Sequence, residues 1–126
     1  MKAAKEEAAA KRKRLRYLRD HTELVLEDWN WREEHGYAIA EGKVTNISGM
    51  SLKNVEAIVT FKNESGEFIT TGSALLEYNP ILDGQSSPFK VYATWNPAMS
   101  KASISFKKLM GGVLTHVSRE RMEELE

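Results

Sequence analysis

The chain has 126 residues, no cysteine, and equal numbers of basic and acidic side chains, 18 of each. A chain of this length fits one domain whose core is large enough to fold without disulfides or a structural metal. The hydrophobic content of 41% and the charged content of 29% are typical of a globular protein and exclude a disordered chain. No apolar run reaches the roughly 18 residues that a membrane span needs.

The charge is unevenly distributed along the chain. Residues 1–20 contain eight Lys or Arg against three Asp or Glu, a charge of +5, so the remaining residues carry −5. Segment 3–19 is rich in Ala, Lys, Glu, Arg and Leu, which predicts a helix. Its apolar stripe is thin and consists essentially of Ala4, Ala8, Leu15 and Leu18. We therefore expect this helix to project from the domain, or to dock only by its last turn, and to be dispensable for folding.

A basic run in this helix is its candidate interaction patch. It consists of Lys11, Arg12, Lys13 and Arg14, with Leu15, Arg16, Tyr17 and Arg19 beside them. Basic helices neutralise the phosphates of nucleic acids or of anionic lipid head groups. Nucleic-acid binding is disfavoured, because the rest of the chain shows no surface for reading or stacking bases. The sequence favours a linker or juxtamembrane helix near an anionic membrane surface, and exchange of this arm between two chains would give a homodimer.

From Thr22 onward the hydrophobic period changes from helical to two, which indicates strands. The strands are separated by turn signals such as Asn63–Gly66 and Asp83–Gly84. Short strands at regular spacing with no intervening helix favour an antiparallel β-sandwich over an alternating β-α fold. The seven predicted strands span residues 22–32, 37–46, 54–62, 67–77, 88–95, 101–109 and 113–117. We expect an arm at 1–20, a sandwich domain at 21–118 and a tail at 119–126 that forms a frayed helical turn.

Alternation within the strands predicts which side chains form the core. In segment 54–62 the apolar residues occupy every second position, so they share one face of the strand. The same pattern recurs in segments 88–95 and 101–109. The predicted core is Val44, Val59, Phe61, Phe89, Val91, Ile104 and Phe106, and Phe68 is assigned to the same set.

Four separated segments carry a family resemblance. They are residues 42–48 (GKVTNIS), 52–61 (LKNVEAIVTF), 72–80 (GSALLEYNP) and 84–89 (GQSSPF). In this order they resemble the FxLYD-type domain, a bacterial immunoglobulin-like β-sandwich, over residues 37–112. The resemblance implies an immunoglobulin-like sandwich of about seven strands in an envelope or secreted protein, with no assigned catalysis. It also implies a location in the cell envelope, with a membrane anchor in a longer precursor. The lack of a long apolar run predicts that the chain as given is soluble.

Few residues offer catalytic or metal-binding chemistry. His21, His35 and His116 come from distant segments without metal-ligand spacing, and no serine lies in a Gly-x-Ser-x-Gly elbow. Glu33 and Glu34 are expected in the loop after the first strand as solvent-facing charges. The sequence therefore predicts no enzyme, no metal and no cofactor.

Three tryptophans are the remaining candidates for binding. Trp29 and Trp31 lie two apart in one predicted strand, so both face the same side of the sheet, and Trp95 lies near an end of the sandwich. Such rings stack on sugars or dock partners, but small sandwiches commonly bury them, and core packing is favoured here. The predicted function is a non-catalytic interaction or spacer module that binds a protein by a sheet edge or loops. The alternative is a carbohydrate- or small-ligand-binding sandwich that uses these tryptophans.

Overall fold

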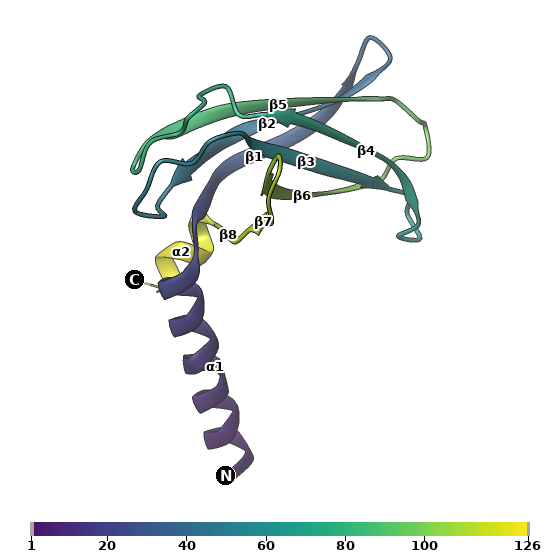
Figure 1. Ribbon diagram of the computed structural model, residues 1–126. Coiled ribbons are helices and arrows are strands. Elements are labelled where there is room, and N and C mark those ends of the chain that lie inside the picture. Colours follow the sequence, from purple (N-terminus) through teal and green to yellow (C-terminus); the bar gives the residue numbers. More distant parts are fainter. Residues whose placement is uncertain (1, 126) are drawn as a thin grey trace.

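A computed structural model describes the backbone of residues 2–125 and the side chains of residues 6–125 (Figure 1). An N-terminal helix precedes a β-rich body, and a short helix follows it. The elements in chain order are α1 (Lys2–His21), β1 (Leu24–Glu34), β2 (Tyr37–Asn46), β3 (Val55–Lys62), β4 (Phe68–Leu75), β5 (Ser86–Thr94), β6 (Lys101–Lys108), β7 (Val113–Leu114), β8 (His116–Ser118) and α2 (Arg119–Leu125).

The strands form two four-stranded sheets that face each other in a sandwich-like arrangement. The strand orders are β5-β2-β1-β8 and β4-β3-β6-β7. Neighbouring strands are antiparallel except for β1 and β8, which are parallel. The predicted all-β class with an N-terminal helix is therefore confirmed at this level. The final predicted strand, 113–117, is wrong as one element, because the chain passes at Thr115 from one sheet to the other and forms β7 and β8.

One core fills the space between the two sheets. Phe61 and Phe106 are fully buried, and Phe89 meets Phe106 edge-on with ring centroids 5.7 Å apart. Val44, Val59 and Val91 are also buried, as predicted, whereas Ile104 packs against the core while partly exposed. The assignment of Phe68 to the core is wrong. Its side chain is 65% exposed, because β4 begins there and a register shift near this end breaks the alternation that placed it inside.

The two sides of the sandwich are closed to different degrees. On the β4–β5 side, called here the closed flank, Glu77 donates its N–H to the carbonyl of Pro88 (3.1 Å) and Tyr78 donates to Ser87 Oγ (3.0 Å). A Cβ on Gly72 would lie 2.7 Å from the carbonyl oxygen of Tyr92, so only glycine allows β4 to approach β5 this closely. On the other side, β7 and β8 cover only the end nearest the helices.

A second, smaller cluster attaches the two helices to the outside of β1 (Figure 1). Val25, Val117, Met122 and Leu125 are buried in it, and Leu15 and Leu18 of α1 pack against it. The expectation of a frayed tail is therefore wrong for residues 119–125, since α2 buries Met122 and Leu125 to 7% and 5% exposure; Glu126 lies outside the described residues. The rest of α1 projects, and neither of the described helices has the length and apolar character needed to cross a bilayer.

Candidate functional site: an open flank with two strand edges

The side of the sandwich opposite the closed flank has two unpaired strand edges, and we call it the open flank. It consists of residues 28–34 of β1 and residues 101–105 of β6. β8 pairs only with residues 24–26 of β1, and β7 pairs only with Phe106 and Lys107 of β6. The two edges lie on the same side of the molecule, because β7 and β8 are joined through the single residue Thr115.

Hairpin geometry identifies which backbone groups of β1 face the open flank. His35 and Gly36 form a two-residue turn with φ values of 53° and 83°, typical of a type I′ hairpin. In such a hairpin the flanking residues Glu34 and Tyr37 bond to each other, and every second pair behind them does the same. The N–H and C=O groups of Trp29, Trp31 and Glu33 therefore point away from β2. This hairpin also corrects the prediction for Glu33 and Glu34, which end β1 instead of forming a loop.

The same alternation identifies the outward groups of β6. Leu109 donates its N–H to Asn54 next to β3 (2.9 Å), whereas Lys108 donates to Gly112 on the β7 side (3.2 Å). Even-numbered residues of β6 therefore direct their backbone groups away from β3. Phe106 uses them in its pair with Leu114, but no backbone partner among the described residues is seen for Ala102 and Ile104. A strand edge with free donors and acceptors is a template for another strand.

Tryptophan rings fill the space beneath these two edges. Trp31 meets Phe61 edge-on at 5.3 Å between ring centroids, and Trp95 lies 6.4 Å from Trp31. Trp29 and Ile104 are partly buried against the same core. The structure thus brings Trp31 and Trp95 together and packs all three tryptophans partly buried against the core, and Trp29 also lines the outer-face groove described below.

An outer-face groove of about 710 Å³ crosses β1, β2 and β5. It lies beside the bulge at Glu27, where Gly42 faces Trp29; a Cβ on Gly42 would lie 2.2 Å from the carbonyl oxygen of Asp28. Its polar lining combines acidic, basic and amide side chains. The groove therefore does not present charges of one sign, as an ion-binding site would. These polar side chains are Asp28, Asn30, Glu41, Lys43, Glu77 and Lys90.

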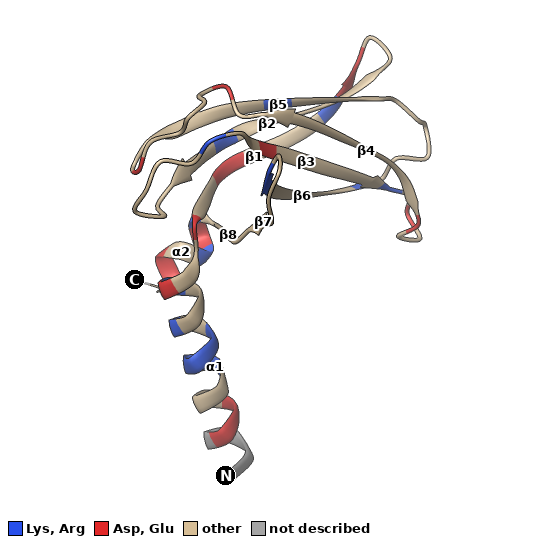
Figure 2. Ribbon diagram, in the orientation of Figure 1, with Lys and Arg blue, Asp and Glu red and all other residues tan. Residues whose placement is uncertain are grey.

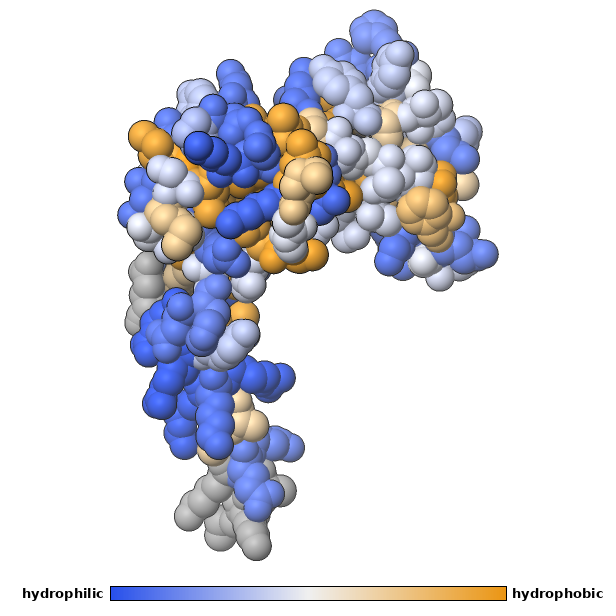
Figure 3. Space-filling view, viewed as in Figure 1, coloured by the Kyte–Doolittle hydropathy of each residue, from blue (hydrophilic) through white to orange (hydrophobic). Residues whose placement is uncertain are grey.

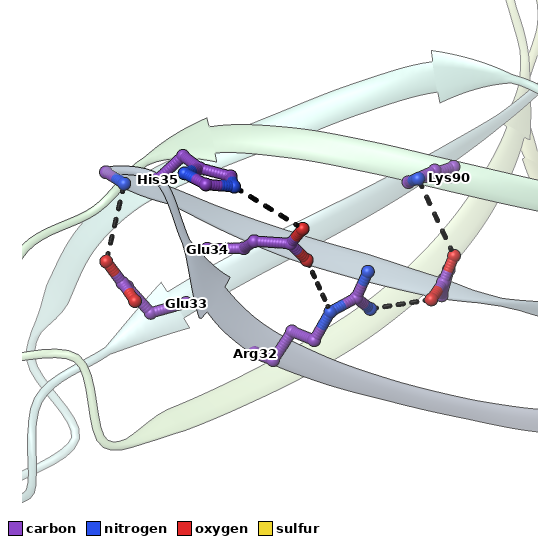
Figure 4. A network of polar contacts seen from close by, with 7 residues as sticks. Arg32, Glu33, Glu34, His35 and Lys90 are labelled. Atoms are coloured by element: carbon purple, nitrogen blue, oxygen red, sulfur yellow. Dashed lines mark hydrogen bonds and ion pairs between the residues drawn. The ribbon is translucent and has the colours of Figure 1, made fainter.

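An ion-pair network extends from this groove toward the hairpin (Figure 4). Arg32 donates to Glu41 (2.6 Å) and to Glu34 (3.0 Å), and Lys90 lies 4.0 Å from the second oxygen of Glu41. The hydrogen bond to Glu41, followed by that to Glu34, raises the pKa of Arg32 above its ordinary value. These contacts satisfy charges on an exposed sheet face, and they bring together no nucleophile and base.

Figure 2 shows that Lys and Arg positions are concentrated in the middle of α1. Their side chains fall into two sets. Arg12, Arg16 and Arg19 line a groove of about 240 Å³ between α1 and α2, with Leu125 and Glu124 on the other wall. Lys11, Lys13 and Arg14 are exposed but do not line this groove. Of the predicted run, only Arg12 therefore belongs to it. It does so together with Arg16 and Arg19, which the sequence placed beside the run and whose spacing of four and seven residues from Arg12 puts them on one helical face. Figure 3 shows mainly hydrophilic side chains on this helix and apolar ones gathered over the body.

The three histidines lie in separate places. His21 stacks on Tyr17 in α1 with ring centroids 4.0 Å apart, and His35 is in the exposed β1–β2 turn. His116 is half-buried and meets Phe106 edge-on at 5.3 Å, and burial lowers its pKa below the ordinary value. Within residues 6–125 the structure gathers no three His, Asp or Glu side chains that would hold a metal ion.

Known proteins show little similarity to this chain. No family model matches it, and no curated protein matches it. Among solved structures it is similar to one described as the structural characterization of IrmA from Escherichia coli. That similarity has a TM-score of 0.47 and 6% sequence identity and covers 77% of this chain and 89% of the other.

Proposed function

We propose that this protein is a non-catalytic, immunoglobulin-like β-sandwich module of the FxLYD type, and that it binds a partner protein by accepting an extended segment of it as an additional strand at the open flank. The observation that carries the proposal is the pair of unpaired edges on β1 and β6, on one side of the molecule. We further propose that the module belongs to a bacterial envelope or secreted protein, on the family resemblance alone.

Strand addition fits the unpaired backbone groups of these edges. An added strand would bond to the outward groups of Trp29 and Trp31 or of Ala102 and Ile104, and its alternate side chains would lie over the partly buried rings. Main-chain hydrogen bonds supply the affinity in this mode, and the side chains on alternate positions supply the specificity. The closed flank offers less room, since β4 at Gly72 lies close to the Tyr92 carbonyl of β5, and the segment that follows β4 bonds to β5 through Glu77 and Tyr78.

The packing of the tryptophans favours this proposal over carbohydrate binding. A sugar platform needs a ring face open to solvent, and Trp29, Trp31 and Trp95 are all packed against the core. Trp31 in addition has Phe61 and Trp95 on its sides. We therefore propose no second function for these rings.

Amide hydrogen exchange tests strand addition residue by residue. The probes are two blocked hexapeptides, one with alternating Val and Glu and one with alternating Val and Lys. We expect at least one of them to slow exchange at the outward amides of one edge, Trp29 and Trp31 or Ala102 and Ile104, because these amides gain an acceptor. The amides of Ser103 and Ser105, already bonded to β3, serve as internal controls. Unchanged exchange at both edges with both peptides would overturn the proposal, as would undiminished binding by the double variant Glu33→Pro, Ile104→Pro.

A further inference from the structure

We propose that β6, and not β1, is the edge that accepts the partner strand, and that this strand carries acidic side chains on its solvent-facing positions. The inference rests on the proposed function and deepens it, because it names both the receiving edge and the chemistry of the occupant.

The β1 edge carries several of the devices that protect natural sheet edges. Its pairing with β2 shifts register at a bulge between Leu26 and Asp28, which twists the strand and interrupts a straight template. Glu33 lies on the same side of the strand as Trp29 and Trp31. Its carboxylate would therefore lie next to the apolar side chains that an incoming strand directs to this side. Arg32 and Glu34 are already joined to each other and, through Arg32, to Glu41.

Residues 101–105 of the β6 edge carry neither a bulge nor a charge on the inward side. Its register with β3 runs without a shift from Lys101 to Lys108, so the strand presents regularly spaced groups. On the inward side Ala102 and Ile104 are apolar and partly buried, and on the solvent side Ser103 and Ser105 are small. Neither face therefore obstructs an incoming backbone, and apolar side chains on its inward positions would extend the surface that Ala102 and Ile104 form.

Charge identifies the occupant. β6 carries Lys101, Lys107 and Lys108 and no acidic residue. Lys107 has a partner in Glu56 of β3 at 4.0 Å, whereas Lys101 faces another lysine, Lys62, across the same pair of strands. Like charges directly opposite each other are destabilising, and opposite charges are stabilising. A strand with a carboxylate next to Lys101 would relieve this repulsion, and a basic strand would increase it.

The length of the free edge limits the occupant. Phe106 is already paired with Leu114, so the unpaired run is residues 101–105. Paired strands have the same rise of about 3.3 Å per residue, so each residue of the edge lies opposite one residue of an added strand. This run therefore accommodates roughly five residues of an extended segment. The partner segment is therefore short, with apolar side chains at alternate positions and acidic side chains between them.

Binding of the two hexapeptides to edge-blocked variants tests the inference. Ile104→Pro removes an outward N–H of β6 and leaves the bonds to β3, and Glu33→Pro does the same for β1 and its bonds to β2. Fluorescence anisotropy should show that the Val-Glu peptide binds the unmodified protein, that Ile104→Pro weakens it by about tenfold or more, and that Glu33→Pro changes it by less than about twofold. Thermal melting of both variants shows whether each is folded.

A charge reversal that leaves the backbone unchanged gives an independent answer. Lys101→Glu should weaken the Val-Glu peptide and strengthen the Val-Lys peptide, and both effects should diminish at high salt. Weakening by Glu33→Pro with no effect of Ile104→Pro and Lys101→Glu would overturn the choice of β6 while leaving strand addition intact. Preference of the unmodified protein for the Val-Lys peptide would overturn the acidic occupant. Absence of binding by both peptides would overturn the proposed function itself.

Discussion

The two flanks of this sandwich are built from the same kinds of strand but end differently. At the closed flank, β4 and β5 come close enough that a Cβ on Gly72 would meet the Tyr92 carbonyl, and Glu77 and Tyr78, which follow β4, donate hydrogen bonds to β5. At the open flank, β7 and β8 have two and three residues and leave most of β1 and β6 uncovered. The difference teaches that only one side of this core is completed by the chain itself.

The largest expected effect concerns the core that both flanks share. Phe106→Ala should cost about 3–5 kcal/mol of unfolding free energy, because it removes a fully buried ring that contacts Phe89 and His116. Phe68→Ala, the control, should change it by less than about 0.5 kcal/mol, because that ring is exposed. Urea denaturation measures both, and equal losses would contradict the placement of Phe68.

A second pair of variants compares the flanks directly. Gly72→Val at the closed flank should destabilise by about 1–3 kcal/mol, because its side chain would force β4 away from β5. Ala102→Val at the open flank should change the unfolding free energy by less than about 1 kcal/mol, since the larger side chain has room at an uncovered edge. Chemical denaturation checks both values. A greater loss for Ala102→Val than for Gly72→Val would show that the open flank is the more tightly packed of the two.

The end of the open flank nearest the helices depends on one ion pair. Arg119 donates to both oxygens of Glu27 at 2.8 and 2.7 Å, and Thr45 donates to the same carboxylate at 2.6 Å. Glu27→Gln should cost about 1–2 kcal/mol, whereas Glu124→Gln, in an exposed pair with Arg121, should cost less than about 0.5 kcal/mol. Thermal melting compares the two variants, and equal effects would show that the Glu27 pair contributes nothing beyond an ordinary surface pair.

The same carboxylate gives a pH dependence with a definite sign. Hydrogen bonds from Arg119 lower the pKa of Glu27, against burial, which raises it. Its contribution is therefore present above the ordinary carboxyl pKa and is lost as the pH falls through the lowered value of the folded state. Denaturation across the acid range should show a shallower loss of stability in Glu27→Gln than in the unmodified protein.

A smaller pH effect is expected at His116, beside β7. Burial lowers the pKa of His116, so the unfolded chain takes up a proton at a higher pH than the folded one. Stability should therefore decrease slightly as the pH falls below the ordinary histidine pKa of about 6.5, and the decrease should continue to the lowered value of the folded state. His116→Phe should remove this slope. An unchanged slope in denaturation between about pH 7.5 and 5.5 would contradict it.

The smallest expected effect is at the arm. Deleting residues 1–12 should leave the melting midpoint nearly unchanged, because this part of α1 projects from the body. Deleting residues 1–18 should lower it, since Leu15 and Leu18 pack against the cluster with Met122 and Leu125. The earlier expectation that the whole arm is dispensable holds only for its first part if both results are obtained.

Much of the fold was readable from local patterns. The alternation in segment 54–62 placed Val59 and Phe61 in the core, and Ala, Lys and Glu near the start predicted the helix that the structure shows as α1. The pattern failed where position along the strand decided burial, as for Phe68 at the beginning of β4. It also failed at Thr115, because a one-residue passage between sheets leaves no break in the apolar alternation.

The candidate site was less predictable. The sequence marked Trp29, Trp31 and Trp95 but not which of them meet. Trp31 and Trp95 lie far apart along the chain and come together only because the end of β5 pairs with the start of β2, at the β1–β2 hairpin. Ala102 and Ile104 carry no signal of their own, because an edge residue and a central-strand residue have the same alternation. Arg16 and Arg19 were recognised beside the basic run, but only the structure shows that they share a groove with Arg12 and α2.

By itself, the sequence determined the helix, the two-residue alternation of the strands and most of the core, because these depend on neighbours within a few positions. The tertiary structure alone decided the strand order, the length of β7 and β8, and hence which edges stay unpaired. The physical reason is that a strand's free edge is defined by what lies beside it in space, and hydrogen-bonding capacity is the same for every residue along the backbone.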